Sequence, residues 1–245
     1  MFDSQRYIQN SFNVVFPRQP SIRRLANEFE DKLKCSYAQP QIVPIPDDLD
    51  PEVPRMIFGS QHGYSQIIVS QISIALSVTY SPDWQEDISK GQRYLLDKVS
   101  TIFDLLSLLD QVKPCFSGLT TRVNLSSQQN DKQIVKRLTD AFLRNSEFDD
   151  LDEIQVKIAR ITEARFYSNI TIHNYRTWKF EAPPQGPVRY SRGKSVERGI
   201  QVIGDFNDRH RFNEDENYYS SLHASEQIIN SALMEVAQTV EKLRG

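Results

Sequence analysis

The sequence predicts an α+β fold in which antiparallel sheets are covered by long amphipathic helices. Three observations predict this class: apolar residues alternate over residues 65–80, a helical apolar stripe covers 88–109, and a second long stripe covers 222–243. Similar patterns of strands and helices precede each stripe. We therefore predict two pseudo-repeated strand-helix-strands-helix units, at about residues 1–113 and 114–245, which form two domains or one continuous domain.

The first strand is predicted at residues 11–16, where apolar and polar side chains alternate. Pro20 and Ser21 then begin a helix, because the apolar residues that follow have helical spacing. The apolar face of this helix consists of Ile22, Leu25, Phe29 and Leu33.

Residues 55–58 and 65–80 predict a β-meander joined by a tight turn at 61–64. In the turn, a glycine follows His62 and accepts the positive φ that such turns require. An unbroken strand over 65–80 would be about 53 Å long at roughly 3.3 Å per residue, so we expect a break near Ser70 and Gln71. We interpret His62 as a turn residue, because no neighbour in sequence is identified as its catalytic partner.

A long helix is predicted from Ser81, with Ser81 as N-cap and Pro82 at the first helical position. Asp83 and Glu86 offer an alternative capping box. Gly91 lies near the apolar stripe of this helix, where glycine costs about 1 kcal/mol relative to alanine. We therefore expect Gly91 to allow a close approach of the helix to the sheet.

The second half repeats this order of patterns. A strand at 115–125 leads to a helix that starts at Asn130 or Asp131, and further strands and a long helix follow. The later strands are predicted at 154–161, 165–180 and 199–206, and the final helix carries the stripe over 222–243.

Two stretches of the second half carry a resemblance to a known family. They are Gly118-Leu119-Thr120-Thr121-Arg122-Val123-Asn124, after the first long helix, and Gly204-Asp205-Phe206-Asn207-Asp208, in a late strand. With the meander and long helix before them, they resemble a sporadically distributed family of prokaryotic proteins of unknown function. The family has arginine at the position of Thr120 and aspartate at that of Asn207. The resemblance implies a two-part α+β layout and no known chemistry.

Composition restricts the classes of function. The net charge is −3 and the pI is about 5.9, which argues against a surface devoted to nucleic acid. No apolar run approaches the roughly 18 residues needed to cross a membrane, and no secretory signal precedes the first strand, so we expect a cytoplasmic protein. Cys35 and Cys115 are interpreted as free thiols.

A metal site is the main catalytic alternative. The sequence contains no nucleophile elbow, phosphate-binding loop or paired zinc-ligand motif. At the end of a predicted strand, Asp205, Asp208 and His210 offer oxygen and imidazole ligands. The same residues are typical of a turn, because aspartate and asparagine side chains bond to their own backbone. We favour the turn and expect no cofactor.

One segment differs from the rest in composition, namely residues 181–198. Its prolines and glycines predict an irregular loop, and such loops on a rigid scaffold carry binding residues without disturbing the core. We expect it to bind another protein, with nucleic acid or another anion as the alternative partner. The predicted binding residues are Arg189, Tyr190, Arg192, Lys194 and Arg198.

The sequence therefore favours a non-catalytic interaction protein. By analogy with the resembling family, we expect an accessory role in bacterial defence or in a toxin-antitoxin-like system. The alternatives are a metal-dependent hydrolase or nuclease, and a carrier of a small ligand on the concave sheet face beneath the helices. A homo-oligomer is compatible with every one of these functions.

Overall fold

The computed structural model describes residues 2–143, 151–162, 164–179 and 195–244. The predicted alternating segments form strands in it, and the segments with helical spacing form helices. The elements of the first half are β1 (Ser4–Val15), η1 (Ile22–Leu25), α1 (Ala26–Leu33), β2 (Gln41–Ile42), β3 (Met56–Gly59), β4 (Ser65–Val69), β5 (Ser73–Thr79), α2 (Pro82–Gln85) and α3 (Ile88–Leu106).

The second half contains fewer short elements. Its elements are β6 (Phe116–Ser126), α4 (Asp131–Phe142), β7 (Gln155–Ile161), β8 (Tyr167–Thr177), β9 (Glu197–Asn207), α5 (Arg209–Glu214) and α6 (Leu222–Arg244).

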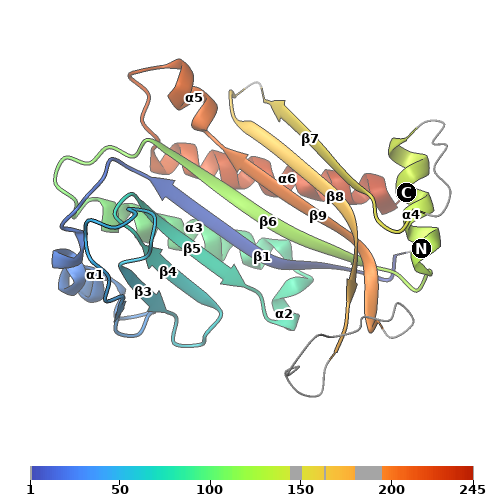
Figure 1. Cartoon of the computed structure of the whole chain (residues 1–245), viewed down its shortest axis with the longest axis horizontal. Coiled ribbons are helices and arrows are strands. Elements are labelled where there is room, and N and C mark those ends of the chain that lie inside the picture. The colour runs from blue at the N-terminus through green and yellow to red at the C-terminus, as the bar shows by residue number, and fades with distance from the viewer. Residues whose placement is uncertain (1, 144–150, 163, 180–194, 245) are drawn as a thin grey trace.

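The nine strands of the described residues belong to one antiparallel sheet, in the order β2-β3-β4-β5-β1-β6-β9-β8-β7 (Figure 1). The α+β class with antiparallel strands is confirmed, but the strands form one sheet instead of several. The reason is the central pairing of β1 with β6, which extends from Ser4 opposite Ser126 to Val15 opposite Phe116. This pairing satisfies backbone groups that would be unpaired at the edge of two separate sheets.

The two halves place their elements in a similar order around this central pair. From the centre outward, the strands are β1-β5-β4-β3-β2 on one side and β6-β9-β8-β7 on the other, so the two-residue β2 has no counterpart among the described residues of the second half. In each half a short helix, α2 or α5, follows the last strand and precedes the long helix. No repeat is detected in the described part of the chain, so the expected repetition stays a prediction.

The long helices α3 and α6 contact each other and cover the same face of the sheet, behind the strands in Figure 1. Their buried apolar residues pack on the alternating buried residues of the strands to form one core. Gly91 of α3 is buried, and a Cβ atom at this position would lie 2.9 Å from the hydroxyl oxygen of Tyr80, which follows β5. The expected close approach at Gly91 is confirmed.

The turns of the first half agree with the sequence patterns, whereas the predicted long helix is divided into the short helix α2 and the long helix α3. Gly63 has a φ of +74°, as the turn between β3 and β4 requires, and β4 and β5 are separated at Ser70 and Gln71. Ser81 and Pro82 begin α2 as expected. The Asp87 carboxylate then accepts hydrogen bonds from backbone N–H groups at the start of α3, so a second helix begins there.

Three further differences concern short or polar elements. Strand β1 begins at Ser4, seven residues before the predicted start at Ser11, because its polar first part pairs with β6. The first helix begins as the 3₁₀ helix η1 before continuing as α1, and neither β2 nor α5 was predicted. No described helix is both long and apolar enough to cross a membrane.

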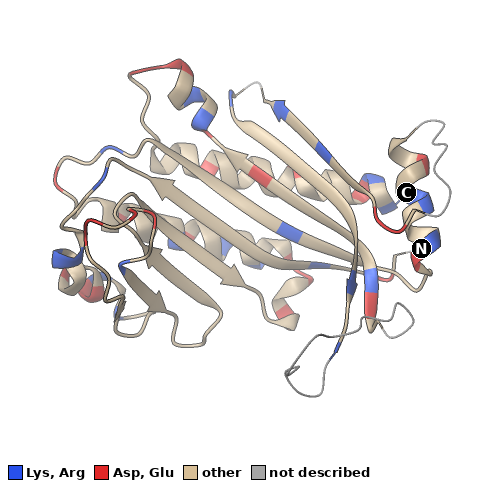
Figure 2. Cartoon of the chain, viewed as in Figure 1, with Lys and Arg blue, Asp and Glu red and all other residues tan. Residues whose placement is uncertain are grey.

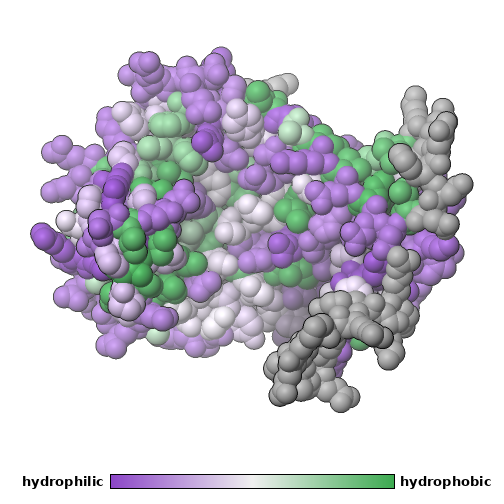
Figure 3. Space-filling view, in the orientation of Figure 1, coloured by the Kyte–Doolittle hydropathy of each residue, from purple (hydrophilic) through white to green (hydrophobic). Residues whose placement is uncertain are grey.

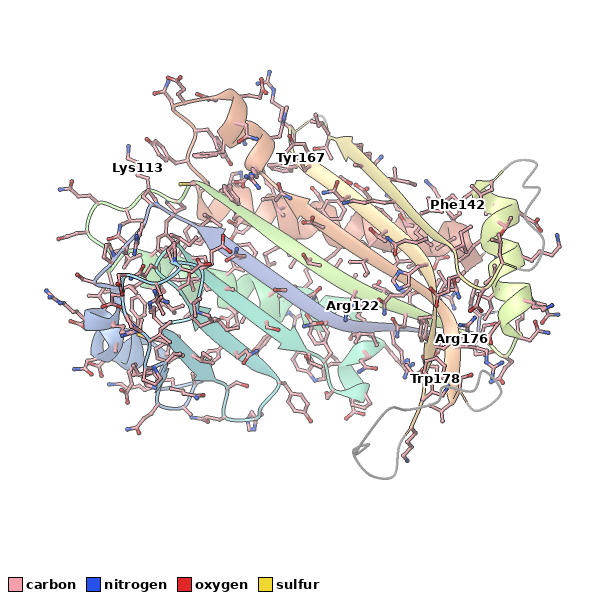
Figure 4. The ribbon with its side chains drawn as sticks, in the orientation of Figure 1. Lys113, Arg122, Phe142, Tyr167, Arg176 and Trp178 are labelled. Carbon is pink, nitrogen blue, oxygen red and sulfur yellow. The ribbon has the colours of Figure 1, made fainter. Side chains whose placement is uncertain are left out.

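The long helices leave the opposite face of the sheet uncovered, and among the described helices α5 packs on one end of it, where His210 contacts Tyr167 and Phe212 contacts Phe116 (Figure 1). Figure 3 shows hydrophilic and neutral residues along β1 and β6 on this face, and Figure 2 shows few charged residues along these strands. Arg122 of β6 lies near the middle of the face (Figure 4). The described residues therefore form a sheet with one face covered by the long helices and a largely polar second face that is open apart from the end under α5.

Candidate functional site

The predicted binding loop falls largely on residues that the structure does not describe. Arg189, Tyr190, Arg192 and Lys194 lie outside the described residues. The last residue of the predicted segment, Arg198, belongs to strand β9 and is half-buried, so it is a strand residue and not part of an irregular loop.

Arg198 lines a polar hollow of about 520 Å³ at the start of β1 and β9. Arg6 and Glu197 form an ion pair in this hollow, and the Tyr175 hydroxyl donates a hydrogen bond to the same Glu197 carboxylate. Burial raises the pKa of Glu197, but the hydrogen bonds from Arg6 and Tyr175 outweigh it and lower the pKa overall. The charges of this hollow therefore neutralise one another.

The three residues of the predicted metal site have different surroundings. Asp208 is fully buried, and its carboxylate accepts hydrogen bonds from the Ser117 backbone N–H at 2.6 Å, the Tyr218 hydroxyl at 2.7 Å and the Ser220 hydroxyl at 2.6 Å. It therefore connects the end of β9 to β6 and to the segment before α6. Burial and the Asp208 hydrogen bond raise the pKa of Tyr218, which keeps this hydroxyl protonated.

Asp205 and His210 are held by other contacts. The Asp205 carboxylate accepts hydrogen bonds from the side-chain amides of Asn169 and Asn207, each at 3.4 Å. The His210 ring packs against the ring of Tyr167, with 5.3 Å between the ring centroids. Within the described residues, no group of three or more His, Cys, Asp or Glu is placed to hold a metal ion.

His62 leads to a site that the sequence did not reveal. It occupies the β3–β4 turn, as predicted, and it also lines a hollow of about 480 Å³. In Figure 1 this turn and α2 both lie along the lower edge of the molecule. We call this hollow the aromatic cleft; its lining residues are Cys35, Ser36, Ser60, Gln61, His62, Tyr64, Val78, Thr79, Tyr80, Ser81, Trp84, Tyr94 and Lys98.

Aromatic side chains from α2, α3, the β3–β4 turn and the end of β5 meet in the aromatic cleft. Trp84 of α2 and Tyr94 of α3 pack edge to face, with their ring centroids 6.1 Å apart and their planes at 89°. Trp84 is 38% exposed and Tyr64, in the β3–β4 turn, is 54% exposed. Rings that are open to solvent inside a hollow offer contact area to a ligand.

Hydrogen bonds fix the wall behind these rings. The hydroxyl groups of Tyr94 and Ser65 lie 2.6 Å apart, and those of Ser65 and Tyr37 lie 3.2 Å apart. Tyr80 accepts a hydrogen bond from the Asn10 side-chain amide at 2.7 Å. Burial raises the pKa of both Tyr37 and Tyr80, so these phenols stay protonated and neutral. These phenols are therefore held in place by hydrogen bonds and carry no charge.

Lys98 supplies the positive charge of the aromatic cleft. Its side chain is only 12% exposed, and its ammonium nitrogen lies 5.5 Å from the centroid of Tyr94 and 6.0 Å from that of Tyr37. These distances are within the range of cation–π attraction. The ammonium group also approaches the Ser36 hydroxyl at 3.5 Å and the carboxylate of Asp97 at 3.1 Å.

Cys35 and His62 are the residues of the aromatic cleft with nucleophilic or acid–base chemistry. The Cys35 thiol is free and exposed, and Cys115 is also free, as predicted. Among the described residues, no hydrogen bond joins Cys35 to His62. The two side chains are therefore not arranged as an activated nucleophile and its base.

Sequence reasoning missed Tyr94, Trp84 and Lys98. Tyr94 and Lys98 are four residues apart on α3 and therefore lie on one side of the helix, beside the apolar stripe. This four-residue spacing is the sequence pattern that could have identified the two residues as neighbours. It did not distinguish a cleft from an ordinary helix surface, because Tyr37 and the β3–β4 turn are distant in sequence.

The small-ligand alternative placed its site on the sheet face beneath the helices, but buried apolar side chains fill that space. The aromatic cleft lies instead beside α3, at the start of β4 and the end of β5. The stretches behind the family resemblance, 118–124 and 204–208, lie on neighbouring strands, with Thr120 opposite Asp205. No protein family, curated protein or solved structure matches this chain.

Proposed function

We propose that the protein is a non-catalytic binding protein that receives a flat apolar group in the aromatic cleft. The observation that carries this proposal is the exposure of Trp84 and Tyr64 beside Tyr94 and Tyr80 in a hollow of about 480 Å³. Pockets for small molecules commonly have volumes of about 300 to 1,000 Å³ and aromatic walls. Tryptophan and tyrosine are also the residues that most often anchor protein partners.

Both a small ligand and a side chain of a partner protein fit this proposal. It keeps the expected binding function and moves the site from the 181–198 segment to the first half of the chain. The roles in defence or in a toxin-antitoxin-like system, a homo-oligomer and the cytoplasmic location stay predictions.

We also propose that the two halves share one arrangement of strands and helices and that they differ at this site. Supporting this, the four strands nearest the centre have the same outward order in each half, and each half has a short helix before its long helix. At the end of the last strand, however, the first half has Tyr80 and the second has the buried Asp208. Only the first of these two residues lines the aromatic cleft. The proposed binding function therefore belongs to the first half.

The proposal predicts that an uncharged aromatic probe binds beside Trp84. N-phenyl-1-naphthylamine fluoresces when it leaves water, and it accepts excitation energy from a nearby tryptophan. Because Trp84 and Trp178 are the two tryptophans of the chain, Trp178→Phe leaves Trp84 as the donor. We expect energy transfer in this variant, and about tenfold weaker binding after Trp84→Ala, which corresponds to about 1.4 kcal/mol.

The matched control is Tyr219→Ala, which removes another exposed ring outside the aromatic cleft. Tyr219 is 43% exposed and packs against Lys113, so its loss should leave probe binding unchanged. Equal weakening by both variants, or no energy transfer from Trp84, would contradict the proposed site.

A further inference from the structure

The residues that line the aromatic cleft carry one formal charge, that of Lys98. The described lining contains no aspartate or glutamate, and its other polar side-chain groups are hydroxyls, a thiol, an amide, the Trp84 indole N–H and the His62 ring. A positive charge in a largely apolar hollow is less screened than a charge at the open surface. The electrostatics of the cleft therefore favour a ligand with a negative charge.

The present partner of Lys98 leaves this charge available to a ligand. Asp97, which pairs with it, is 69% exposed, whereas the Lys98 side chain is 12% exposed. A pair with such an exposed carboxylate is weak, because water and salt compete for the acid. An anionic group that enters the cleft loses water at a cost in free energy, but it meets the charge of Lys98 where water and salt screen that charge less than they screen the exposed pair with Asp97.

We infer that the aromatic cleft recognises an aromatic carboxylate, whose ring contacts Trp84 and Tyr94 and whose carboxylate pairs with Lys98. This inference rests on the proposed binding function and specifies the class of ligand. The aromatic rings and the ammonium group belong to the same cleft, since Lys98 lies 5.5 Å from the centroid of Tyr94 and Trp84 packs on that ring. A ring and an acid separated by a short aliphatic chain can therefore meet both partners.

Two sources carry this chemistry. One is a free aromatic acid, and the other is the C-terminal phenylalanine, tyrosine or tryptophan of a partner protein, which has a ring and a carboxylate on one residue. The Ser36, Ser60 and Gln61 side chains at the cleft provide polar groups for the peptide backbone in the second case.

The test compares each acid with its neutral amide. 3-Phenylpropionate and 3-phenylpropionamide have the same ring and chain, as do a pentapeptide that ends in phenylalanine and its C-terminal amide. Displacement of N-phenyl-1-naphthylamine measures the affinity of each. Within each pair, we expect the acid to displace the probe at a concentration about tenfold lower than the amide requires, because a charge-assisted hydrogen bond is stronger than a neutral one.

Variants test whether Lys98 is the source of the preference for the acid over the amide. Lys98→Met keeps the length of the side chain and removes the charge, so the acid and the amide should bind equally. Lys113→Met is the matched control, since Lys113 also lies over a tyrosine ring, at 4.5 Å from the centroid of Tyr219, but outside the cleft. Asp97→Asn, at an exposed position, should strengthen binding of the acid by removing the competing carboxylate.

The outcomes separate this inference from the proposed function. Failure of the neutral probe to bind would overturn both. Probe binding without any preference for the acid, or a preference that survives Lys98→Met, would overturn the carboxylate inference and leave the binding function in place. Tighter binding of the pentapeptide than of 3-phenylpropionate indicates the protein terminus as the source, and the reverse order indicates the free acid.

Discussion

At the scale of single residues, His173 shows how surroundings set the charge of a side chain. It lies on β8, opposite Gln201 of β9 and Gln155 of β7, and it is half-buried on the polar side of its strand. Its Nδ1 atom is buried and has no hydrogen-bond partner among the described residues. Burial lowers the pKa of His173, the positive charge of Arg122 lowers it further, and Glu153 opposes this in part.

We predict that His173 stays neutral at pH values where an ordinary histidine, with a pKa of about 6.5, is protonated. Below about pH 6.5, His173 binds a proton more readily in the unfolded chain than in the folded chain. The free energy of unfolding should therefore fall as the pH decreases. NMR titration of the ring protons should give a lowered pKa, and Arg122→Met should raise it. Arg24→Met, in η1, is the control, and an unchanged pKa in Arg122→Met would contradict the assigned cause.

Single residues could be predicted where their role depends on nearby sequence. Gly63 is in the predicted turn, and Asn130 caps α4 in a capping box with Gln133. Tyr94 and Lys98 could not be recognised in this way. Their partners Tyr37 and Ser36 lie about sixty residues earlier and meet α3 only in the folded chain.

At the scale of elements, periodicity located most helices and strands but not their ends. The long helix was expected from Ser81 onward, but the structure starts α3 after Asp87 because the carboxylate of that residue caps it. Strand β2 has two residues and α5 has six, which is too short for a periodic pattern to appear. The order of strands in the sheet depends on the pairing of β1 with β6, which no local pattern encodes.

Gly91 provides a test of the packing between α3 and the sheet. We predict that Gly91→Leu decreases the free energy of unfolding by about 1 to 3 kcal/mol, although leucine has the better helix propensity. The reason is that a Cβ atom would lie 2.9 Å from the hydroxyl oxygen of Tyr80, which is buried. Urea denaturation measures the change. Ser100→Leu, at an exposed position of α3, is the control, and an unchanged or increased stability of Gly91→Leu would contradict this packing.

At the scale of the whole molecule, the continuous sheet makes the two halves depend on each other. Strand β1 pairs with β5 of its own half and with β6 of the other, and α3 contacts α6. The buried residues of both halves form one core. The predicted order of strand, helix, strands and helix occurs in each half, whereas the division into two units stays a prediction, because sequence periodicity does not report which strand edges pair.

This dependence predicts the behaviour of the separated halves. Fragments 1–113 and 114–245 would each expose a full strand edge, at β1 or β6, and an apolar side of α3 or α6. We expect neither fragment alone to show a cooperative thermal transition, because each loses the central pairing and the contact between the two long helices. Mixing the fragments should restore a single transition, measured by circular dichroism. The control is a chain cut by a protease at an inserted site between residues 109 and 115, which folds before it is cut and should keep its transition. A cooperative transition in an isolated fragment would show instead that the halves are separate domains, since its core would then be stable without the β1–β6 pair.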